Sequence, residues 1–285
     1  MLTVEKVNSN MFEDVYKLLN KFENARVNKS HWKNLFCHPW ATPEDYVGFK
    51  LQNDQTIVGF IGLIFCKREI RGEIHKFCNL TSLIVEEEYR RETLALFLEI
   101  RKIEGHTLTN LTPSKEVYSI CKALGFSDLE EKIKILPTLP SWMGIFSTGD
   151  RFVSVPEKIM TYLSKKDVQI YKDHVRALCK TLLYVKENDY CLIFYKTVRR
   201  KGLAFNHILF ISNINLFMTS KNKILIKLFV LEKHIFHLID SRILGEDFKG
   251  FTWDYPLVRP RLFKSDKLRK EDIDNLYSEF VLLPI

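Results

Sequence analysis

The stretch Leu83-Ile84-Val85-Glu86-Glu87-Glu88-Tyr89-Arg90-Arg91-Glu92-Thr93-Leu94-Ala95-Leu96-Phe97-Leu98 decides the fold of this 285-residue chain. Its first three residues predict the end of a buried strand, and the spacing of its later apolar residues predicts a helix that begins near Glu92. Amide N–H groups at a helix N-terminus attract anions, and two arginines lie directly before this one. We therefore expect the turn to bind a diphosphate.

The same stretch resembles the acyl-CoA-binding motif of the GNAT superfamily of N-acyltransferases. In that motif an apolar strand ends in Val, an aromatic residue and Arg or Gln follow four to five residues later, and two small residues open a helix. The matching residues here are Val85, Tyr89, Arg90 and Ala95, whereas Thr93 stands where the first Gly is expected.

A second, shorter motif supports the resemblance. The family often closes a helix with Tyr-x-x-x-Gly-Phe, and Ala123-Leu124-Gly125-Phe126 matches the second half of this element. Cys121 occupies the Tyr position. The two partial motifs occur in the family's order, so the resemblance implies a mixed α/β GNAT fold over residues 1–137.

The segment Leu136-Pro137-Thr138-Leu139-Pro140 predicts a domain boundary because a proline lies on each side of Thr138. Beyond it, the expected order of helix, long hairpin, helix and strand echoes the first half. We therefore expect residues 138–285 to form a second α+β domain, either a degenerate GNAT-like domain in tandem with the first or an unrelated one.

The elements expected along the chain follow from apolar periodicity and from turn residues. Asn10, with Glu13 three residues later, predicts an N-cap, and Ser114 predicts another. Strands are expected at 2–7, 46–50, 57–66, 74–85, 106–111, 126–136, 190–198, 203–212 and 234–240. Helices are expected at 12–22, 29–36, 92–104, 114–124, 156–164 and 167–183, a helix with a possible strand at 213–229, and a helix or final strand at 272–283.

The resemblance implies acyl-CoA as the co-substrate and assigns its binding to one set of residues. The pantetheine arm would pair with the strand that ends at Val85, and a backbone N–H of Ile84 or Val85 would polarise the thioester carbonyl. The amine would attack directly in a ternary complex, without a metal or a covalent intermediate. The residues assigned to acyl-CoA are Leu83, Ile84, Val85, Arg90, Arg91, Glu92, Thr93, Leu94, Ala95, Asn110 and Ser114.

The groups that move protons are less clearly marked, because the family's usual base positions correspond to Asn79 and Thr81, which are not bases. The candidate bases are His75, Glu73 and a water chain that ends at Asn79. The candidate acids are Cys121, for which packing in the core is the favoured explanation, and Tyr118 one turn earlier.

The composition is that of a globular protein, with 46% hydrophobic and 27% charged residues. No apolar run approaches the ~20 residues of a membrane span, and Met1-Leu2-Thr3-Val4-Glu5 lacks the features of a signal peptide. The six cysteines include no Cys-x-x-Cys pair, which favours reduced thiols in a cytoplasm over a disulfide framework or a zinc site.

The net charge of +8 comes from the second half of the chain. Residues 1–140 hold 19 Lys+Arg and 19 Asp+Glu, whereas residues 141–285 hold the remaining 24 and 16. Arg259 and Arg261, with Trp253 and Tyr255 nearby, could clamp a phosphate and stack a base. An amino sugar, free or nucleotide-linked, is therefore our preferred primary-amine acceptor.

Two other classes of function remain open. The chain could be a catalytically inactive GNAT-like scaffold, or a nucleic-acid binder that uses the basic second half. The nucleic-acid reading ranks last because basic and aromatic residues are not interleaved as in known modules. The sequence does not indicate the oligomeric state.

Overall fold

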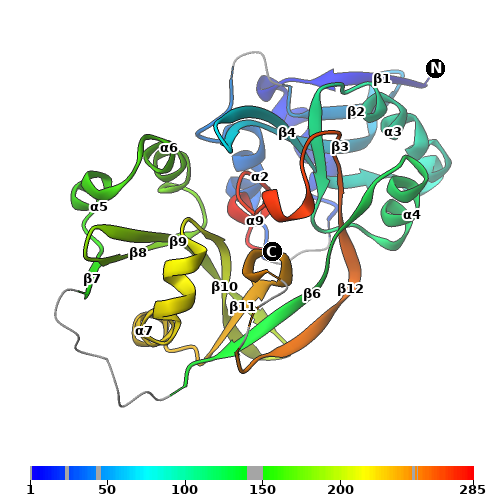
Figure 1. The fold of residues 1–285 in the computed structure, drawn as a ribbon. Helices are drawn as coiled ribbons and strands as arrows, with labels where there is room; N and C mark the ends of the chain where they lie inside the picture. Colours follow the sequence, from blue (N-terminus) through cyan, green and yellow to red (C-terminus); the bar gives the residue numbers. More distant parts are fainter. Residues whose placement is uncertain (1, 23–25, 43–45, 140–149, 246–247, 249) are drawn as a thin grey trace. The chain divides into compact units, whose positions relative to one another are not determined.

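The structure is a computed structural model that describes residues 2–22, 26–42, 46–139, 150–245, 248 and 250–285 (Figure 1). The chain forms two compact units, and neither is one continuous segment. Unit 1 comprises Met1–Leu129, Arg259–Asp272 and Tyr277–Ile285, and unit 2 comprises Glu130–Val258 and Ile273–Leu276.

Unit 1 contains a mixed sheet with the strand order β1-β2-β3-β4-β5-β12. All pairs of neighbouring strands with a described register are antiparallel except β4 and β5, which are parallel. Its strands are β1 (Leu2–Val7), β2 (Gly48–Asn53), β3 (Thr56–Ile70), β4 (Glu73–Val85), β5 (His106–Asn110) and the second half of β12 (Trp253–Lys264). Its helices are η1 (Ser9–Met11), α1 (Phe12–Leu19), α2 (Lys29–Phe36), η2 (Glu87–Glu92), α3 (Thr93–Arg101), α4 (Lys115–Ala123), η3 (Lys270–Asp272) and α9 (Glu279–Leu282).

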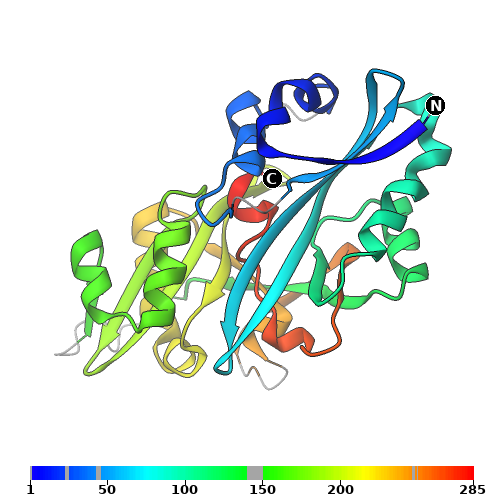
Figure 2. The same ribbon diagram turned by 90° about the horizontal axis from the view of Figure 1, so that it is seen from above.

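Both faces of the unit 1 sheet are covered by helices. Figure 2 shows α1 and α2 over one face and α3 and α4 over the other. The core beneath α3 and α4 includes Leu63, Leu80, Leu96, Phe97 and Cys121, all at most 1% exposed. The central strand β3 is covered on both faces, and its residues 58–66 are accordingly all buried.

Unit 2 repeats this arrangement of strands, in the order β6-β11-β10-β9-β8-β7. The pair β10 and β11 is parallel, and the other pairs are antiparallel. Its strands are β6 (Ser127–Pro137) from Glu130 onward, β7 (Asp150–Val153), β8 (Lys180–Lys186), β9 (Asp189–Arg200), β10 (Leu203–Ile211) and β11 (Phe236–Asp240), and its helices are α5 (Pro156–Tyr162), α6 (Lys165–His174), α7 (Ile214–Glu232) and α8 (Ser241–Leu244).

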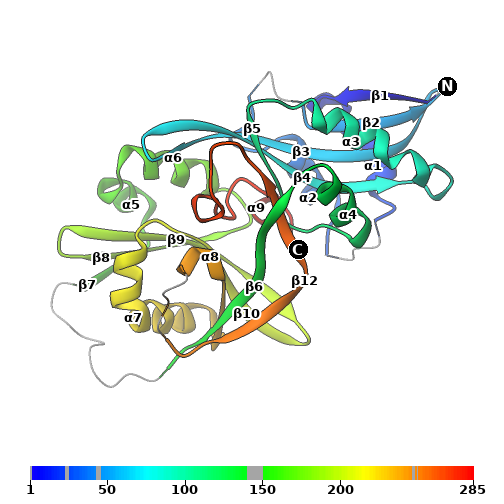
Figure 3. The ribbon, with the colours of Figure 1, turned by 45° about the vertical axis from the view of Figure 1, so that its right-hand side comes forward.

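Alternation along the strands explains how unit 2 packs. Cys191, Ile193 and Tyr195 of β9 belong to the core that includes Phe217 of α7. On the opposite face, Phe194 contacts the ring of His174 at the end of α6. Figure 3 accordingly shows α7 and α6 on opposite sides of β9.

Each unit takes its last strand from the other half of the sequence. In unit 1, Leu262, Phe263 and Lys264 of β12 pair with β5. In unit 2, residues 133–137 of β6 pair with β11. The proline pair predicts a single boundary at 137/138 between two continuous domains. The chain instead passes from unit 1 to unit 2 within β6, between Leu129 and Glu130, and returns to unit 1 within β12.

Two local predictions were wrong, and one strand was missed. The α1 helix begins after a 3-10 turn, and its N-cap is Met11 rather than Asn10. The helix expected at 167–183 ends at His174, because residues 180–186 form strand β8. Strand β12 was missed, because Pro256 and Pro260 argue against a strand. The N-cap at Ser114 is confirmed, since its side chain accepts a hydrogen bond from the Val117 N–H.

Candidate functional site

The candidate site lies where β4 and β5 part. Their parallel pairing ends at Asn79 and Thr109, whereas β4 continues to Val85 and stays paired with β3 over that length. The backbone groups of residues 80–85 that face away from β3 therefore have no described strand partner. Such an edge can accept an extended ligand as an added strand.

A β-bulge shapes this free edge. The register between β3 and β4 shifts between Phe60 and Gly62, so that Ser82 and Leu83 lie opposite the single residue Ile61. Ser82 has a φ of +54°, in the left-handed region that residues other than Gly rarely adopt. Bulges of this kind re-aim backbone groups and occur next to active sites. Here the bulge turns the backbone of β4 at the pocket described next.

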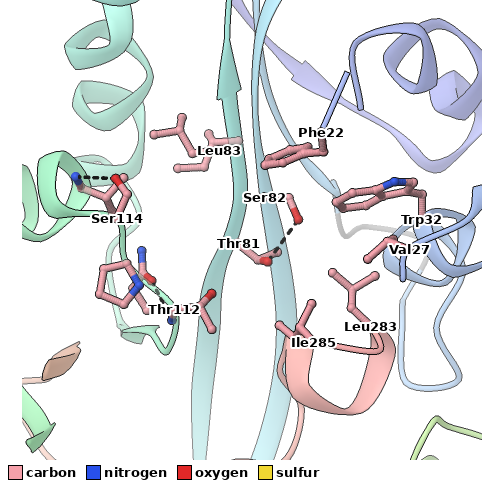
Figure 4. A pocket seen from close by; sticks show the side chains of 14 residues that line it. Phe22, Val27, Trp32, Thr81, Ser82, Leu83, Thr112, Ser114, Leu283 and Ile285 are labelled. Carbon is pink, nitrogen blue, oxygen red and sulfur yellow. Dashed lines mark hydrogen bonds between the residues drawn. The ribbon is translucent and has the colours of Figure 1, made fainter. Parts of the chain in front are cut away.

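A pocket of about 230 Å³ opens at the bulge (Figure 4). Its polar wall combines Thr81 and Ser82 of β4 with Asn110, Thr112 and Ser114, which follow β5. Its remaining walls are apolar and consist of Phe22, Val27, Trp32, Ile61, Leu83, Pro113, Val117, Leu283 and Ile285. In the view of Figure 4, Thr112 and Ser114 lie on one side of β4, and Phe22 and Trp32 lie on the other. The pocket thus joins the end of β4 to the α1–α2 region.

The turn after β4 is the place where the sequence predicts an anion site. Residues Glu87–Glu92 form a 3-10 helix that leads directly into α3, whose N-cap Glu92 makes no side-chain cap hydrogen bond. The Arg90 side chain is 71% exposed and lies 3.8 Å from Glu87. Arg91, Glu92 and Leu94 are also exposed, and Ala95 is half-buried. The Arg90 and Arg91 side chains are therefore accessible to a ligand, whereas the Thr93 backbone N–H is already bonded to the carbonyl oxygen of Arg90.

Thr93 occupies the position at which the motif has its first glycine. Its hydroxyl donates a hydrogen bond of 2.8 Å to the carbonyl oxygen of Arg90. The side chain therefore supports the junction between the 3-10 helix and α3. The Thr93 backbone N–H donates to the same carbonyl oxygen, so both polar groups of Thr93 are used within the turn.

The residues proposed to move protons lie in different places. Cys121 is 0% exposed within the core, and burial raises the pKa of its thiol to about 12. Tyr118 is half-buried and donates to Asp128. His75 precedes Thr81 by six residues of one strand, a separation of about 20 Å at ~3.3 Å per residue. None of these three is among the described residues that line the pocket.

Asn79 lies next to the pocket but is buried, with 2% of its surface exposed. Its side-chain N–H donates to the hydroxyl of Thr109 at 3.1 Å, and its oxygen accepts from the backbone N–H of Glu279 at 3.4 Å. Asn79 therefore connects β4 to the helix α9. These contacts make it a residue that holds other groups in position.

Glu279 is the residue that sequence reasoning missed. Its carboxyl group is completely buried, and its Oε1 accepts a hydrogen bond of 2.8 Å from the hydroxyl of Thr112, a residue of the pocket wall. Burial raises the pKa of this carboxyl to about 7, although the Thr112 hydrogen bond and the Arg261 charge oppose the shift. The available signal was that Glu279 is an acidic residue directly before the apolar run Phe280-Val281-Leu282-Leu283.

The phosphate clamp expected at Arg259 and Arg261 is not formed. Arg261 is 2% exposed and lies over the ring of Phe280, and the Nε of Arg259 donates to the carbonyl oxygen of Pro113. Both arginines belong to β12, which the sequence did not predict. The guanidinium of Arg261 is therefore too buried to bind the phosphate of a nucleotide.

The corresponding place in unit 2 is filled by the chain itself. The parallel pairing of β10 with β11 ends at Ile208 and Ile239, and a register shift with the antiparallel neighbour follows, as it does in β4. There the backbone N–H of Asn275 donates to the carbonyl oxygen of Leu209 at 3.3 Å. Residues 273–276 thus occupy the edge of β10 that corresponds to the free edge of β4.

Buried polar groups hold this filling segment. The guanidinium of Arg242, 8% exposed, donates to the Ile273 carbonyl oxygen at 2.9 Å and to the Asn275 side chain at 2.7 Å. It also pairs with Asp240 and Glu130. These buried contacts hold residues 273–276 at the edge of β10. Removal of the segment would leave the Arg242 guanidinium without two of its hydrogen-bond acceptors.

Comparison with solved structures identifies the fold. The chain is similar to a conserved protein of Enterococcus faecalis V583 described as a probable N-acyltransferase, with a TM-score of 0.63 and 12% identity over 95% of this chain and 74% of that one. It is also similar to a GCN5-related N-acetyltransferase from Kribbella flavida, with a TM-score of 0.58 and 9% identity over 92% and 70% of the two chains. The chain has the GNAT fold.

A third structure with this likeness is the Saccharomyces cerevisiae N-myristoyltransferase with bound myristoyl-CoA and inhibitors. Its TM-score is 0.50 and its identity 11%, over 100% of this chain and 86% of that one. The comparison with protein-family models finds no match, and the sequence comparison with curated proteins finds none. The resemblance read from Val85, Arg90 and Gly125 is thus confirmed at the level of the GNAT fold.

Two further findings concern the described part of the chain. None of its helices is long and apolar enough to cross a membrane. Within the same residues, no three or more His, Cys, Asp or Glu side chains are grouped so that they could hold a metal ion.

Proposed function

We propose that the protein is an acyl-CoA-dependent N-acyltransferase, which transfers an acyl group to a primary amine by direct attack in a ternary complex. The observation that carries this proposal is the pocket at the bulge of β4, at the point where β4 and β5 part. A thioester bound along the free edge of β4 would bring its carbonyl carbon to this pocket. The amine would enter from the α1–α2 side.

Each part of acyl-CoA has a group suited to it. The pantetheine arm would pair with residues 80–85, and a backbone N–H near Leu83 or Ile84 would polarise the thioester carbonyl. The diphosphate would bind at the start of α3, where the exposed Arg90 and Arg91 side chains would pair with it. Asn110 and Ser114, both in the pocket wall, would contact the arm from the β5 side.

The size and lining of the pocket narrow the substrates. A volume of about 230 Å³ lies below the ~300–1,000 Å³ of a drug-sized site, which favours an acetyl group and a compact amine. Phe22, Val27 and Trp32 favour an acceptor whose body is apolar. An amino sugar remains a hypothesis to be tested, and the burial of Arg261 removes the argument for a nucleotide-linked one.

We further propose that unit 2 is a degenerate GNAT-like domain without an acyl-CoA site. Its strand order and its parallel pair repeat those of unit 1. Residues 273–276 occupy the edge at which a pantetheine arm would pair. The chain would then bind one acyl-CoA.

The test combines binding and turnover. We expect purified protein to bind acetyl-CoA, and Arg90→Ala/Arg91→Ala to weaken binding about tenfold or more without changing the unfolding midpoint. Arg101→Ala, an exposed arginine at the other end of α3, is the matched control and should leave the affinity unchanged. If the double variant and the control behave alike, the phosphate site is misplaced.

Turnover is tested with acetyl-CoA and a panel that contains phenethylamine, cyclohexylamine and glucosamine. We expect release of CoA with the apolar amines. Turnover of glucosamine alone would restore the amino-sugar acceptor. Binding of acetyl-CoA without turnover of any primary amine would favour the inactive scaffold.

A further inference from the structure

We propose that Thr112 and Glu279 form a proton relay that removes a proton from the ammonium form of the acceptor amine. This inference rests on the proposed N-acyltransferase function and names the base that the reaction needs. The proposed relay runs from the pocket, through the hydroxyl of Thr112, to the buried carboxyl of Glu279.

The geometry connects the two residues directly. Thr112 is exposed and lines the pocket, and its Oγ1 donates to Oε1 of Glu279 at 2.8 Å. Figure 4 shows the Thr112 side chain beside β4, near the bulge. Its hydroxyl keeps a lone pair for a donor in the pocket while its proton points to Glu279. An amine near the bulge could therefore transfer a proton to Glu279 without contacting it.

Glu279 has the features of a proton acceptor rather than of a structural ion pair. Its carboxyl is 0% exposed, and its Oε2 has no hydrogen-bond partner among the described residues. A buried, half-satisfied carboxylate is costly, so burial favours the protonated form of this group and raises its pKa. Its pKa of about 7 follows from burial, which outweighs the opposing effects of Thr112 and Arg261. A base with a pKa near the working pH is the most effective.

Its surroundings fix the carboxyl in place. Thr112 and Asn79 bond to Glu279, and Arg261 of β12 is the charged group that acts on it. Asn79, which the sequence suggested as the end of a proton path, instead anchors the backbone N–H of Glu279 at the point where β4 and β5 part. Asn79 is thus a positioning residue for the relay.

Thr112, Glu279 and the leaving thiolate together account for every proton that moves in the reaction. The ammonium gives a proton to the Thr112 oxygen as the Thr112 hydroxyl proton moves to Glu279, which leaves a neutral amine and a neutral carboxyl. The amine then attacks the thioester, a C–N bond forms, and the C–S bond breaks. The second nitrogen proton passes to the departing thiolate to give the CoA thiol. Glu279 returns its proton to solvent after product release.

Kinetics with acetyl-CoA and phenethylamine test the relay. We expect kcat/KM of the wild type to fall as the pH drops below about 7. Glu279→Gln, which keeps the shape of the side chain, should lower kcat/KM about 10²-fold or more at pH 7. The residual rate should rise about tenfold per pH unit, because only free amine then reacts. The affinity for acetyl-CoA should stay unchanged.

Further variants separate the relay from a structural role. Thr112→Val should reproduce the loss of rate, whereas Thr112→Ser, which keeps the hydroxyl, should retain most of it. Glu104→Gln, an exposed carboxylate of unit 1, is the control. A Glu279→Gln enzyme with the wild-type pH profile would overturn the relay and leave the acyltransferase function standing.

A direct titration does not depend on turnover. The carboxyl carbon of Glu279, assigned by its loss in Glu279→Gln, is followed by ¹³C NMR in protein labelled with [5-¹³C]glutamate. A midpoint near pH 7 supports the relay, and a midpoint below about 5 overturns it. Failure of wild-type protein to bind acetyl-CoA would instead refute the proposed function, and the relay with it.

Discussion

Replacement of Glu279 by Gln should make the folded protein more stable at alkaline pH, although it removes the proposed base. The carboxyl has a pKa of about 7 in the folded state and a reference value of 4.5. At 1.36 kcal/mol per pH unit, this difference corresponds to about 3 kcal/mol.

The sign follows from proton linkage. The folded state binds the proton more tightly than the unfolded state, so the carboxyl costs nothing below pH 4.5. Its cost grows as the pH rises and is complete above about 7. Glutamine carries no such cost at any pH. The stability of Glu279→Gln relative to the wild type should therefore increase by about 2–3 kcal/mol between pH 5 and pH 8.

Urea unfolding at pH 5, 6, 7 and 8 measures this increase. The chain has four tryptophans, and a Trp142→Phe/Trp253→Phe background leaves Trp32 and Trp40, which belong to unit 1, as the fluorescent reporters. Comparison of the two proteins at each pH cancels the contribution of other titrating groups. A stability difference that is the same at pH 5 and pH 8 would refute the raised pKa of Glu279.

Other predictions concern the bulge, the core and unit 2. Ser82→Gly should change the free energy of unfolding by less than about 1 kcal/mol, because relief of the left-handed conformation offsets the entropic cost of glycine. Ser82→Val should lower the free energy of unfolding and also the affinity for acetyl-CoA, which calorimetry measures. Cys121→Ser should cost about 1–3 kcal/mol in urea unfolding and leave the pH–rate profile unchanged; a changed profile would return the thiol to the mechanism. Arg242→Met should cost about 3–5 kcal/mol because it leaves Asp240 and Glu130 buried without their cation; a loss below 1 kcal/mol would show that unit 2 does not need this network.

The first half of the fold could be predicted because its local signals agree. The apolar run of β4, the charged turn and the helix after it lie in one continuous stretch, and Gly125 adopts a φ of +84° directly after α4, as a helix-terminating glycine does. These features are set by neighbours in sequence. Sequence reasoning therefore recovered the elements of residues 1–137 and the GNAT fold.

The exchange of strands could not be predicted in this way. Strands β6 and β12 each end a similar half, and local pattern does not say which sheet a strand joins. Pro256 and Pro260 also hid β12, since proline removes a ladder hydrogen bond. The sequence therefore predicts a second domain of residues 138–285, whereas residues 259–272 and 277–285 belong to unit 1.

The proton acceptor was missed for the same reason. Motif spacing pointed to His75, Tyr118 and Cys121, which lie near the motif in sequence. Glu279 bonds to Thr112 of the pocket wall only because residues 277–285 fold back into unit 1. A contact between positions 167 residues apart leaves no periodicity in a single sequence.

Calorimetric titration with acetyl-CoA tests the central claim most directly, with desulfo-CoA and free CoA as comparison ligands. One open edge on β4 and one filled edge on β10 predict a single site per chain, with an affinity on the order of micromolar. The same titration of Ser82→Val should show weaker binding. Absence of binding by the folded wild-type protein, or two sites per chain, would contradict the account.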